Sequence, residues 1–450
     1  MGFRGFLLLA LASATAASGL AAATPAPKAT ASVLPWIDDD YTSALAQAKA
    51  KKIPIFAELW APWCHTCRSM QAFVFTDKAL SQSTGEFVWL SIDTEKARNA
   101  AFLEKFPIRA WPSFYVIDPS KETVALRWVG GATVAQLTKF FAEGTRAGGG
   151  GGSAAASGGP DAALARADAL YAAGDYEKAE KAYAESLELL SPKSPRYARA
   201  VEARLFCLQT THNAAECVAL ARNALPKVAH TASAANLSGS GLDCAVKLPS
   251  GAAGRTDAVS FFKSSVREVL ADRTLPLAAD DRSALYGSLH SALEEAKDAD
   301  GAQKVAVEWV AYLDAEAAHA KTAQERTALD PNRLSAFDAA GEIGKAIPML
   351  EASEKAFPED YNPPARLALV YLRLKQYDTA LEASDRALAR VYGPRKLRVL
   401  AVRADIYGGM GDAAAAKKTV EESLAYAEAL PAGQRSDTAI AALKKQLEGS

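Results

Sequence analysis

A run of glycine, alanine and serine between Arg146 and Pro160 constrains the fold of this chain more than any other feature. The run, Ala-Gly-Gly-Gly-Gly-Gly-Ser-Ala-Ala-Ala-Ser-Gly-Gly, offers almost no side chain that a core could bury, and its backbone is highly flexible. With 450 residues, the chain is also longer than one hydrophobic core usually serves. We therefore predict a flexible linker at residues 146–160 with a separately folded unit on either side.

The N-terminus has the pattern of an export signal. Arg4 precedes a short apolar run over residues 6–12, and small residues follow as far as a cleavage site. The apolar run is too short to span a bilayer, which takes about 20 residues. We predict a cleaved signal peptide over residues 1–23, a flexible segment over 24–35, and an exported protein that is periplasmic or secreted.

The balance of charge argues against nucleic acid and membrane surfaces as partners. The chain has 51 Lys and Arg residues against 52 Asp and Glu residues, so no strong net field favours an anionic polymer or surface. No segment after the N-terminus is apolar and long enough to predict stable membrane insertion. We expect the partners to be proteins or small thiols.

Residues 36–145 mix the patterns of strand and helix. Apolar runs predict strands at 53–60, 86–92, 113–118 and 124–129, and helical patterns cover 41–51, 64–72, 97–106 and 134–141. The first two runs are apolar along almost their whole length, as in strands covered on both faces, and the last two are close enough for a hairpin. This order predicts an α/β domain built on a mixed sheet.

Residues 161–446 differ in composition and carry a repeat. They are rich in Ala, Leu, Glu, Lys and Arg, which favour helix. Small residues recur after 36 residues from Ala179 to Ala215, and after 34 and 36 residues from Ala346 through Ala380 to Ala416. This spacing resembles the tetratricopeptide repeat, a helix-turn-helix unit of 34 residues.

The resemblance to tetratricopeptide repeats covers about five units. They start near residues 160, 196, 327, 361 and 397, whereas residues 233–316 fit the pattern poorly. The resemblance implies an all-α helical-repeat domain over 161–446 whose concave face binds a peptide or protein. An irregular helical bundle is the alternative.

The sharpest chemical signal is the segment Trp60-Ala61-Pro62-Trp63-Cys64-His65-Thr66-Cys67, which follows an apolar strand and opens a helix. A Cys-x-x-Cys pair on a first helical turn brings two sulfurs within bonding distance, and free backbone N–H groups there favour the thiolate of the first cysteine. The motif resembles that of the thioredoxin superfamily. The segment from Ile53 to Lys78, with Phe75-Thr76-Asp77 after the motif, resembles the thioredoxin-like domains of exported reductases. The resemblance implies a thiol-disulfide oxidoreductase in which Cys64 attacks a partner disulfide and Cys67 resolves the mixed disulfide.

The resemblance to the thioredoxin superfamily extends outside the motif. Glu58 stands where the family has a buried acid that moves a proton to and from the second cysteine. Trp111-Pro112 stands where the family has a cis-proline beside the redox disulfide. The resemblance implies catalytic roles for Cys64, Cys67 and Glu58. We expect substrate contacts from Trp63, His65, Trp111 and Pro112.

His65 lies between the two cysteines, and it affects both the redox interpretation of the motif and the alternative that the motif binds a metal. A cationic His65 would stabilise the Cys64 thiolate and favour the reduced form. A static disulfide and a Cys-His-Cys site for zinc or copper are alternatives to redox use, but only two or three ligands are local, so we expect neither a metal nor another cofactor. Covalent haem needs a histidine where the chain has Arg68.

Three further cysteines, Cys207, Cys217 and Cys244, lie in the helical region. Three pairings are possible. We expect a disulfide between Cys217 and Cys244, because the second helix of one repeat packs against the first helix of the next. Three buried thiols are the alternative.

Together these patterns predict an exported thiol-disulfide oxidoreductase that exchanges disulfides with protein substrates and a redox partner protein. In this hypothesis the repeats recruit the partner, and the linker keeps the redox domain close without fixing its orientation. The alternative is a non-catalytic interaction scaffold that uses the thioredoxin fold as a binding module.

Overall fold

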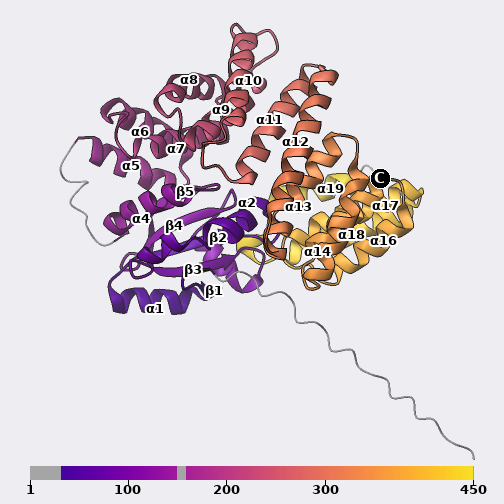
Figure 1. Cartoon of the computed structure of the whole chain (residues 1–450). Helices are drawn as coiled ribbons and strands as arrows, with labels where there is room; N and C mark the ends of the chain where they lie inside the picture. The colour runs from indigo at the N-terminus through magenta and orange to yellow at the C-terminus, as the bar shows by residue number, and fades with distance from the viewer. Residues whose placement is uncertain (1–31, 149–158, 449–450) are drawn as a thin grey trace, which may run out of the picture.

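A computed structural model describes residues 32–148 and 159–448 of the chain. The predicted signal peptide, residues 24–31 of the predicted flexible segment and residues 149–158 of the predicted linker lie outside the described residues. Figure 1 shows an α/β unit, coloured indigo to purple, and a long series of helices, coloured magenta to yellow, that curves over it. The predicted α/β and all-α units are both present.

The α/β unit is built on a five-stranded mixed sheet with the order β1-β3-β2-β4-β5. Strands β1 and β2 pair with β3 in parallel, whereas β4 is antiparallel to both β2 and β5. The strands are β1 (Ile37–Asp38), β2 (Ile55–Trp60), β3 (Val88–Asp93), β4 (Ser113–Asp118) and β5 (Thr123–Val129). The four predicted strands are therefore confirmed within two residues at each end, and β1 is an addition too short to leave a sequence pattern.

Helices cover both faces of this sheet. The helical elements are α1 (Tyr41–Lys51), α2 (His65–Ser69), the π-helical turn η1 (Met70–Val74), η2 (Lys78–Ser83), η3 (Ala97–Asn99), α3 (Ala100–Lys105) and α4 (Val134–Gly148). Alternate residues of β2 serve two cores: Phe56 packs with Phe141 of α4, whereas Ala57 lies in the core that includes Ala48 of α1. Burial on both faces accounts for the continuous apolar run of β2.

One end of the predicted flexible segment packs against the domain. Leu34 is 3% exposed, and the Val33 backbone N–H donates to the Phe75 carbonyl at 3.1 Å. The apolar side chain of Leu34 joins the core that contains Phe75. The structured domain therefore begins before residue 36.

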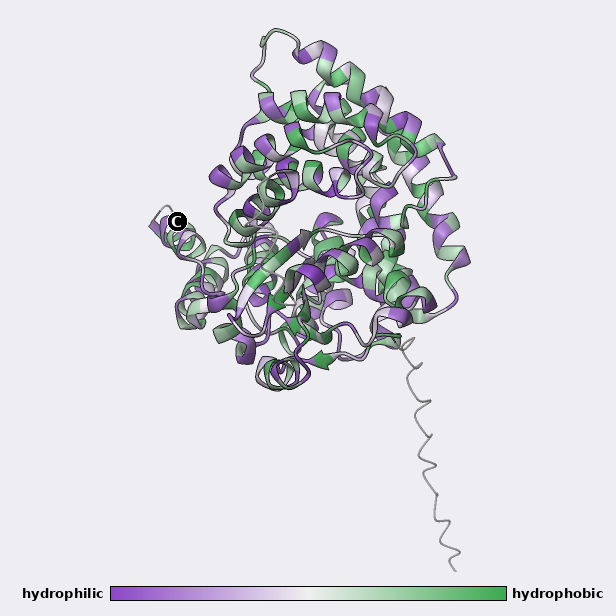
Figure 2. Cartoon of the chain, turned by 90° about the vertical axis from the view of Figure 1, so that its left-hand side faces the viewer, coloured by the Kyte–Doolittle hydropathy of each residue, from purple (hydrophilic) through white to green (hydrophobic). Residues whose placement is uncertain are grey.

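The all-α unit consists of helices arranged mainly in antiparallel pairs. They are α5 (Pro160–Ala172), α6 (Tyr176–Leu189), α7 (Tyr197–Thr210), α8 (Ala214–Ala224), η5 (Leu225–Lys227), α9 (Ser233–Lys247), α10 (Arg255–Ala271), α11 (Ala279–Glu295), α12 (Ala299–His319), α13 (Ala323–Ala339), η6 (Ile343–Lys345), α14 (Ala346–Ala356), α15 (Asn362–Arg373), α16 (Tyr377–Leu388), α17 (Arg395–Met410), α18 (Ala413–Ala429), η7 (Ala432–Gln434) and α19 (Asp437–Glu448). Hydrophobic and hydrophilic residues alternate along many of these helices, as expected where one face is buried (Figure 2).

Small residues set the close packing of these helix pairs. Ala179 and Ala380, at equivalent turns of two repeats, are fully buried. The stretch 233–316 continues the stack with helices α9 to α12, although its sequence fits the repeat poorly. Its close contact uses Gly241, where an added Cβ would lie 2.2 Å from the Phe262 ring. Only a residue without a Cβ fits at this contact.

A disulfide joins Cys217 of α8 to Cys244 of α9, with Cα atoms 6.1 Å apart. The predicted pairing is confirmed, and Cys207 is a buried free thiol. The bond links neighbouring helices of consecutive pairs, as the repeat geometry requires.

We expect a Cys217→Ser, Cys244→Ser double variant to be less stable than the native chain by about 3 kcal/mol, because the disulfide closes a loop of about 27 residues in the unfolded chain. Chemical unfolding followed by helical circular dichroism measures the loss. Cys207→Ala is the matched control. Equal unfolding midpoints for the native chain and the double variant would contradict the expectation.

The repeats contact the α/β unit at both ends of the helical series. At the start, Arg127 of β5 donates to the Tyr176 hydroxyl at 2.9 Å. Near the end, Gly393 and Gly433 approach backbone so closely that an added Cβ would lie 2.1 Å from the carbonyl oxygens of Glu95 and Ala100. These contacts fix the orientation of the two units and correct the expectation that the linker leaves it open.

Candidate active site

Cys64 and Cys67 form a disulfide at the start of α2. Cys64 is the N-terminal cap of the helix, and its Sγ accepts the Cys67 backbone N–H at 3.0 Å. This donor belongs to the unsatisfied N–H groups of a first helical turn, which stabilise negative charge on sulfur. The two residues are 4% and 0% exposed, so the disulfide is almost fully enclosed.

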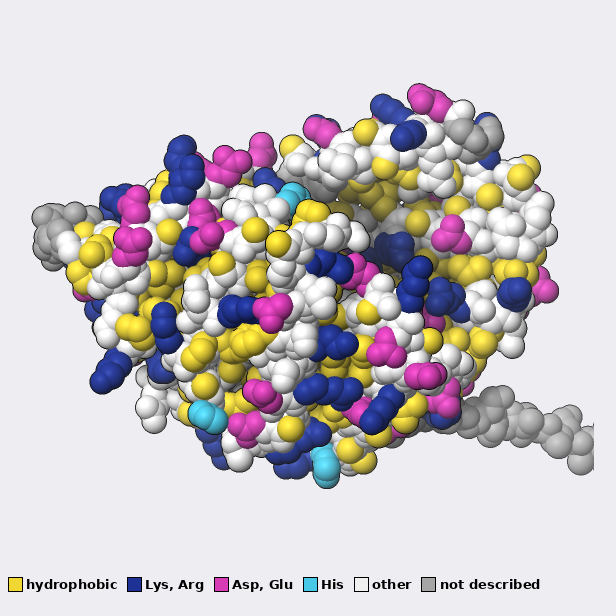
Figure 3. All heavy atoms as spheres, turned by 90° about the horizontal axis from the view of Figure 1, so that it is seen from above, with side chains coloured by type: hydrophobic (Ala, Val, Ile, Leu, Met, Phe, Trp, Pro, Cys, Tyr) yellow, Lys and Arg dark blue, Asp and Glu magenta, His cyan; other side chains and the backbone are white. Residues whose placement is uncertain are grey.

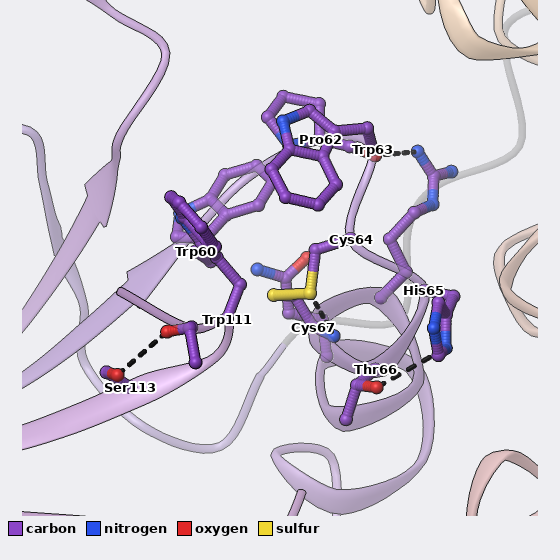
Figure 4. The surroundings of a disulfide bond; sticks show 12 residues. Trp60, Pro62, Trp63, Cys64, His65, Thr66, Cys67, Trp111 and Ser113 are labelled. Atoms are coloured by element: carbon purple, nitrogen blue, oxygen red, sulfur yellow. Dashed lines mark hydrogen bonds between the residues drawn. A yellow bond between two sulfur atoms is a disulfide. The ribbon is translucent and has the colours of Figure 1, made fainter. Parts of the chain in front are cut away.

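Tryptophans lie on one side of this disulfide, and His65 and Thr66 lie on the other (Figure 4). The rings of Trp63 and Trp111 are 5.1 Å apart. The Trp63 indole N–H donates to Glu95 Oε1 at 2.7 Å, and that of Trp111 donates to Thr94 Oγ1 at 2.8 Å. The Trp111-Pro112 peptide bond is cis, as the family resemblance implies. Both indoles are therefore held in defined positions beside the redox centre.

Glu58 lies on β2, beneath the active-site helix, and is 1% exposed. Its Oε1 accepts a hydrogen bond of 3.3 Å from Gln71, which follows α2 in the π-helical turn. Burial raises the pKa of Glu58 to about 8, an effect that the Gln71 hydrogen bond opposes and the charge of Asp38 reinforces. A carboxyl with this pKa can both hold and release a proton near neutral pH.

His65 points to the repeats, away from the sulfurs (Figure 4). Its Nδ1 lies 2.5 Å from Oδ1 of Asp280, the second residue of α11, and Thr66 donates to the other Asp280 oxygen at 2.7 Å. Asn332 of α13 also donates to Asp280 at 2.7 Å. Burial lowers the pKa of His65, but the hydrogen bond and charge of Asp280 raise it above its ordinary value.

Two more residues of the repeats hold the other end of the motif. Arg68 forms an ion pair of 2.7 Å with Asp360, and Asn362 donates to the Pro62 carbonyl at 3.0 Å. No sequence pattern pointed to Asp280, Asp360 or Asn362, because each is an ordinary polar residue in a helical region. Only their contacts with the Cys-His-Thr-Cys motif distinguish them.

We expect Asp280→Asn to lower the pKa of His65, since burial then acts without the opposing carboxylate. The native pKa is raised, so the stabilisation from this ion pair is complete below pH 6.5 and is lost as the pH rises through the raised pKa. NMR titration of labelled histidine measures the shift, with His65→Gln identifying the signal. His230 is the internal control, and an unchanged His65 titration in Asp280→Asn would contradict the assignment.

Over 32–148 and 159–448, no group of three or more His, Cys, Asp or Glu side chains is placed to hold a metal ion. In those two ranges, no helix combines the length and the apolar character that crossing a bilayer requires.

The fold and site define a thioredoxin-like redox domain joined to helical repeats, and comparison with known families agrees. The family model described as a thioredoxin-like domain matches residues 41–145, and the tetratricopeptide repeat model matches residues 361–445. The chain therefore contains a thioredoxin-like domain followed by tetratricopeptide repeats.

Among curated proteins, the chain is similar to thiol:disulfide interchange protein DsbD. It is 32% identical over 82 residues to the protein of Pseudoalteromonas atlantica and 32% identical over 91 residues to that of Yersinia enterocolitica. These stretches cover 18% and 20% of this chain but only 14% and 15% of the relatives. The similarity therefore concerns one domain.

Among solved structures, the chain is similar to a tetratricopeptide repeat protein from Parabacteroides merdae. The identity is 10% and the TM-score is 0.41, over 64% of this chain and 98% of the other. A thermophilic tetratricopeptide repeat protein from Thermus thermophilus has 19% identity and a TM-score of 0.27, over 47% of this chain and 97% of the other.

Proposed function

We propose that this chain is an exported thiol-disulfide oxidoreductase that exchanges disulfides with protein substrates. The observation that carries the proposal is the Cys64–Cys67 disulfide at a helix N-terminus, above the buried Glu58. The name of the relatives, thiol:disulfide interchange protein, supports the same chemistry for this domain. The basic and apolar pattern of residues 1–23 supports export.

The reaction follows from thiol-disulfide exchange. In the reducing direction, the Cys64 thiolate attacks a partner disulfide, forms a mixed disulfide and releases one partner thiolate. Cys67 then gives its proton to Glu58, and its thiolate attacks the Cys64 sulfur. This step closes the Cys64–Cys67 disulfide and releases the second partner thiolate, so two electrons pass to the partner. The reverse sequence oxidises a partner dithiol.

The repeats recruit the protein partner in this proposal. They lie against the redox motif through Asp280, Asp360 and Asn362. A partner bound to the repeats is therefore already close to the disulfide, and the redox domain does not have to move on its linker to reach it. Packing between the two units, rather than the length of the linker, sets the orientation of the redox domain relative to the repeats.

Burial of the disulfide favours a second candidate, a scaffold without catalysis. Cys64 is 4% exposed and its motif is held on one side by α11 and α13. A partner sulfur can reach Cys64 only if the tryptophans or the repeats allow access. The same burial is compatible with catalysis when the partner enters beside Trp63 and Trp111.

Equilibration with a glutathione buffer separates the two candidates. We expect the Cys64–Cys67 disulfide to be reduced and reoxidised reversibly, with fully reversible quenching of tryptophan fluorescence from the flanking indoles. Cys217→Ser, Cys244→Ser serves as the control that isolates the redox pair. A disulfide that stays oxidised at every glutathione ratio in the folded chain would support the scaffold.

A further inference from the structure

A cavity of about 980 Å³ lies between the redox domain and the last repeats. The redox domain contributes Trp63 and Trp111, which neighbour Cys64 and Pro112 in the chain, and the repeats contribute α17 and α19. Seen from above, the molecule is hollowed, with hydrophobic side chains inside the hollow and Lys and Arg side chains at its rim (Figure 3). The cavity has the size of binding sites for small molecules or short peptide segments.

The charged residues that line the cavity are mostly basic. They are Arg109, Arg395, Arg398, Arg435 and Glu95. Both oxygens of Glu95 already accept hydrogen bonds, one from the Trp63 indole at 2.7 Å and one from the Arg395 backbone N–H at 2.6 Å. The cavity therefore has an excess of positive charge that its one carboxylate does not satisfy.

The four arginines are available to a ligand. Among the described residues, none of them has an ion pair with a carboxylate within 4.0 Å. Arg395 stacks over the Trp63 ring with 5.0 Å between guanidinium carbon and ring centroid. Arg109, Arg398 and Arg435 are exposed, and they come from the loop before β4, from α17 and from the chain after η7.

Apolar side chains occupy the space between these charges. Leu103, Ile108, Phe206 and Leu397 line the cavity together with the two tryptophans. A ligand that fits must combine negative charge with apolar groups and must extend from the redox motif to the last helices. An acidic polypeptide segment has these properties, because carboxylates pair with arginine through two N–H donors while its apolar side chains remain free to pack.

We propose that the cavity binds an acidic segment of the protein substrate and so places the substrate disulfide at Cys64. The arginines pair with carboxylates next to the substrate cysteine, and Trp63 and Trp111 contact its apolar side chains. This inference rests on the proposed function and names the substrate class that the redox site accepts.

Two disulfide-containing peptides of the same length test it, one with glutamates flanking the cysteine and one with glutamines at those positions. We expect the native chain to turn over the glutamate peptide with a kcat/KM about tenfold higher. The ratio of the two kcat/KM values should fall with rising salt. It should approach one in the Arg398→Glu, Arg435→Glu double variant. The matched control, Lys139→Glu, Lys181→Glu, makes the same charge change on exposed residues of α4 and α6 and should keep the native ratio.

Equal rates of the native chain on both peptides, or a native ratio in the arginine variant, would overturn the acidic-segment proposal while leaving disulfide exchange intact. If neither peptide is turned over, the proposed function is wrong. The acidic-segment proposal is then tested separately, by measuring peptide binding without turnover. Fluorescence anisotropy then compares cysteine-free versions of the two peptides. Preference for the glutamate peptide, lost in the arginine variant, supports the cavity as an acidic-segment site, and equal affinity contradicts it.

Discussion

Replacing Cys64 with serine is expected to lower the turnover of a small aromatic disulfide by roughly 10³-fold or more, because a hydroxyl at this position cannot replace the thiolate nucleophile. The Cys67→Ser variant should still attack but should accumulate mixed disulfides, since no second thiol releases the partner. Turnover is measured by absorbance of the released thiol, and mixed disulfides by intact-protein mass.

Cys207→Ala is the matched control for these variants. Cys207 is the free cysteine among the described residues, and burial raises the pKa of its thiol to about 12, so it is protonated at working pH. We expect this variant to retain native turnover. Native turnover by Cys64→Ser would show that the exchange chemistry does not pass through the predicted nucleophile.

The second large effect is expected from Glu58→Gln, which removes the proton acceptor for Cys67. The pKa of Glu58 is raised by burial to about 8, so its carboxyl is protonated below that pH and ionised above it. The rate of mixed-disulfide resolution should therefore rise with pH through about 8 in the native chain. In the variant this rise should be lost, and the rate above pH 8 should be roughly 10²-fold lower.

Glu58→Gln lowers the rate of resolution at high pH, but it should raise the stability of the folded chain there. Between pH 4.5 and about 8, folded Glu58 keeps a proton that the unfolded chain releases, so the free energy of unfolding falls as pH rises by about 1.4 kcal/mol per unit. Above about 8 this contribution becomes constant. Glu58→Gln should therefore be more stable than the native oxidised chain at pH 9 by a few kcal/mol.

The exposed Glu86 provides the comparison, and Glu86→Gln should follow the native curves of both rate and stability. Rapid-mixing measurements over pH 6 to 9 and thermal unfolding at the two ends of this range supply the data. A Glu58→Gln variant with the native pH profile for resolution would exclude Glu58 as the proton acceptor.

The sequence predicted those structural features that depend on residues close together in the chain or on a regular spacing. The continuous apolar run of β2 predicted a strand buried on both faces, because both cores draw on alternate residues of one strand. The Cys217–Cys244 disulfide followed from repeat spacing, which determines which helix lies beside which. The motif from Trp60 to Cys67 likewise marked the redox centre, since two cysteines on one helical turn meet without any other part of the fold.

The sequence was less informative where a pattern is weak or is interrupted. Strand β1 has two residues, and a period of two cannot be recognised in so short a segment. The predicted helix 64–72 became α2 and a π-helical turn, a change of hydrogen-bond register that residue types do not specify. The linker composition predicted flexibility of the connection but carried no information about the surfaces that it joins.

By itself, the sequence determined the two fold classes and marked the pair Cys64 and Cys67, because short-range patterns of apolar residues, cysteines and small side chains are sufficient for them. For the repeat disulfide the sequence favoured one of three pairings, and the structure decided in favour of it. Only the tertiary structure decided that Asp280 holds His65, that Asp360 holds Arg68, and that Arg398 lines a cavity beside Trp63. The partners in each of these pairs are more than 200 residues apart in the chain. Their proximity follows from how a long stack of helices curves, and that curvature is the sum of many small packing angles that no local pattern encodes.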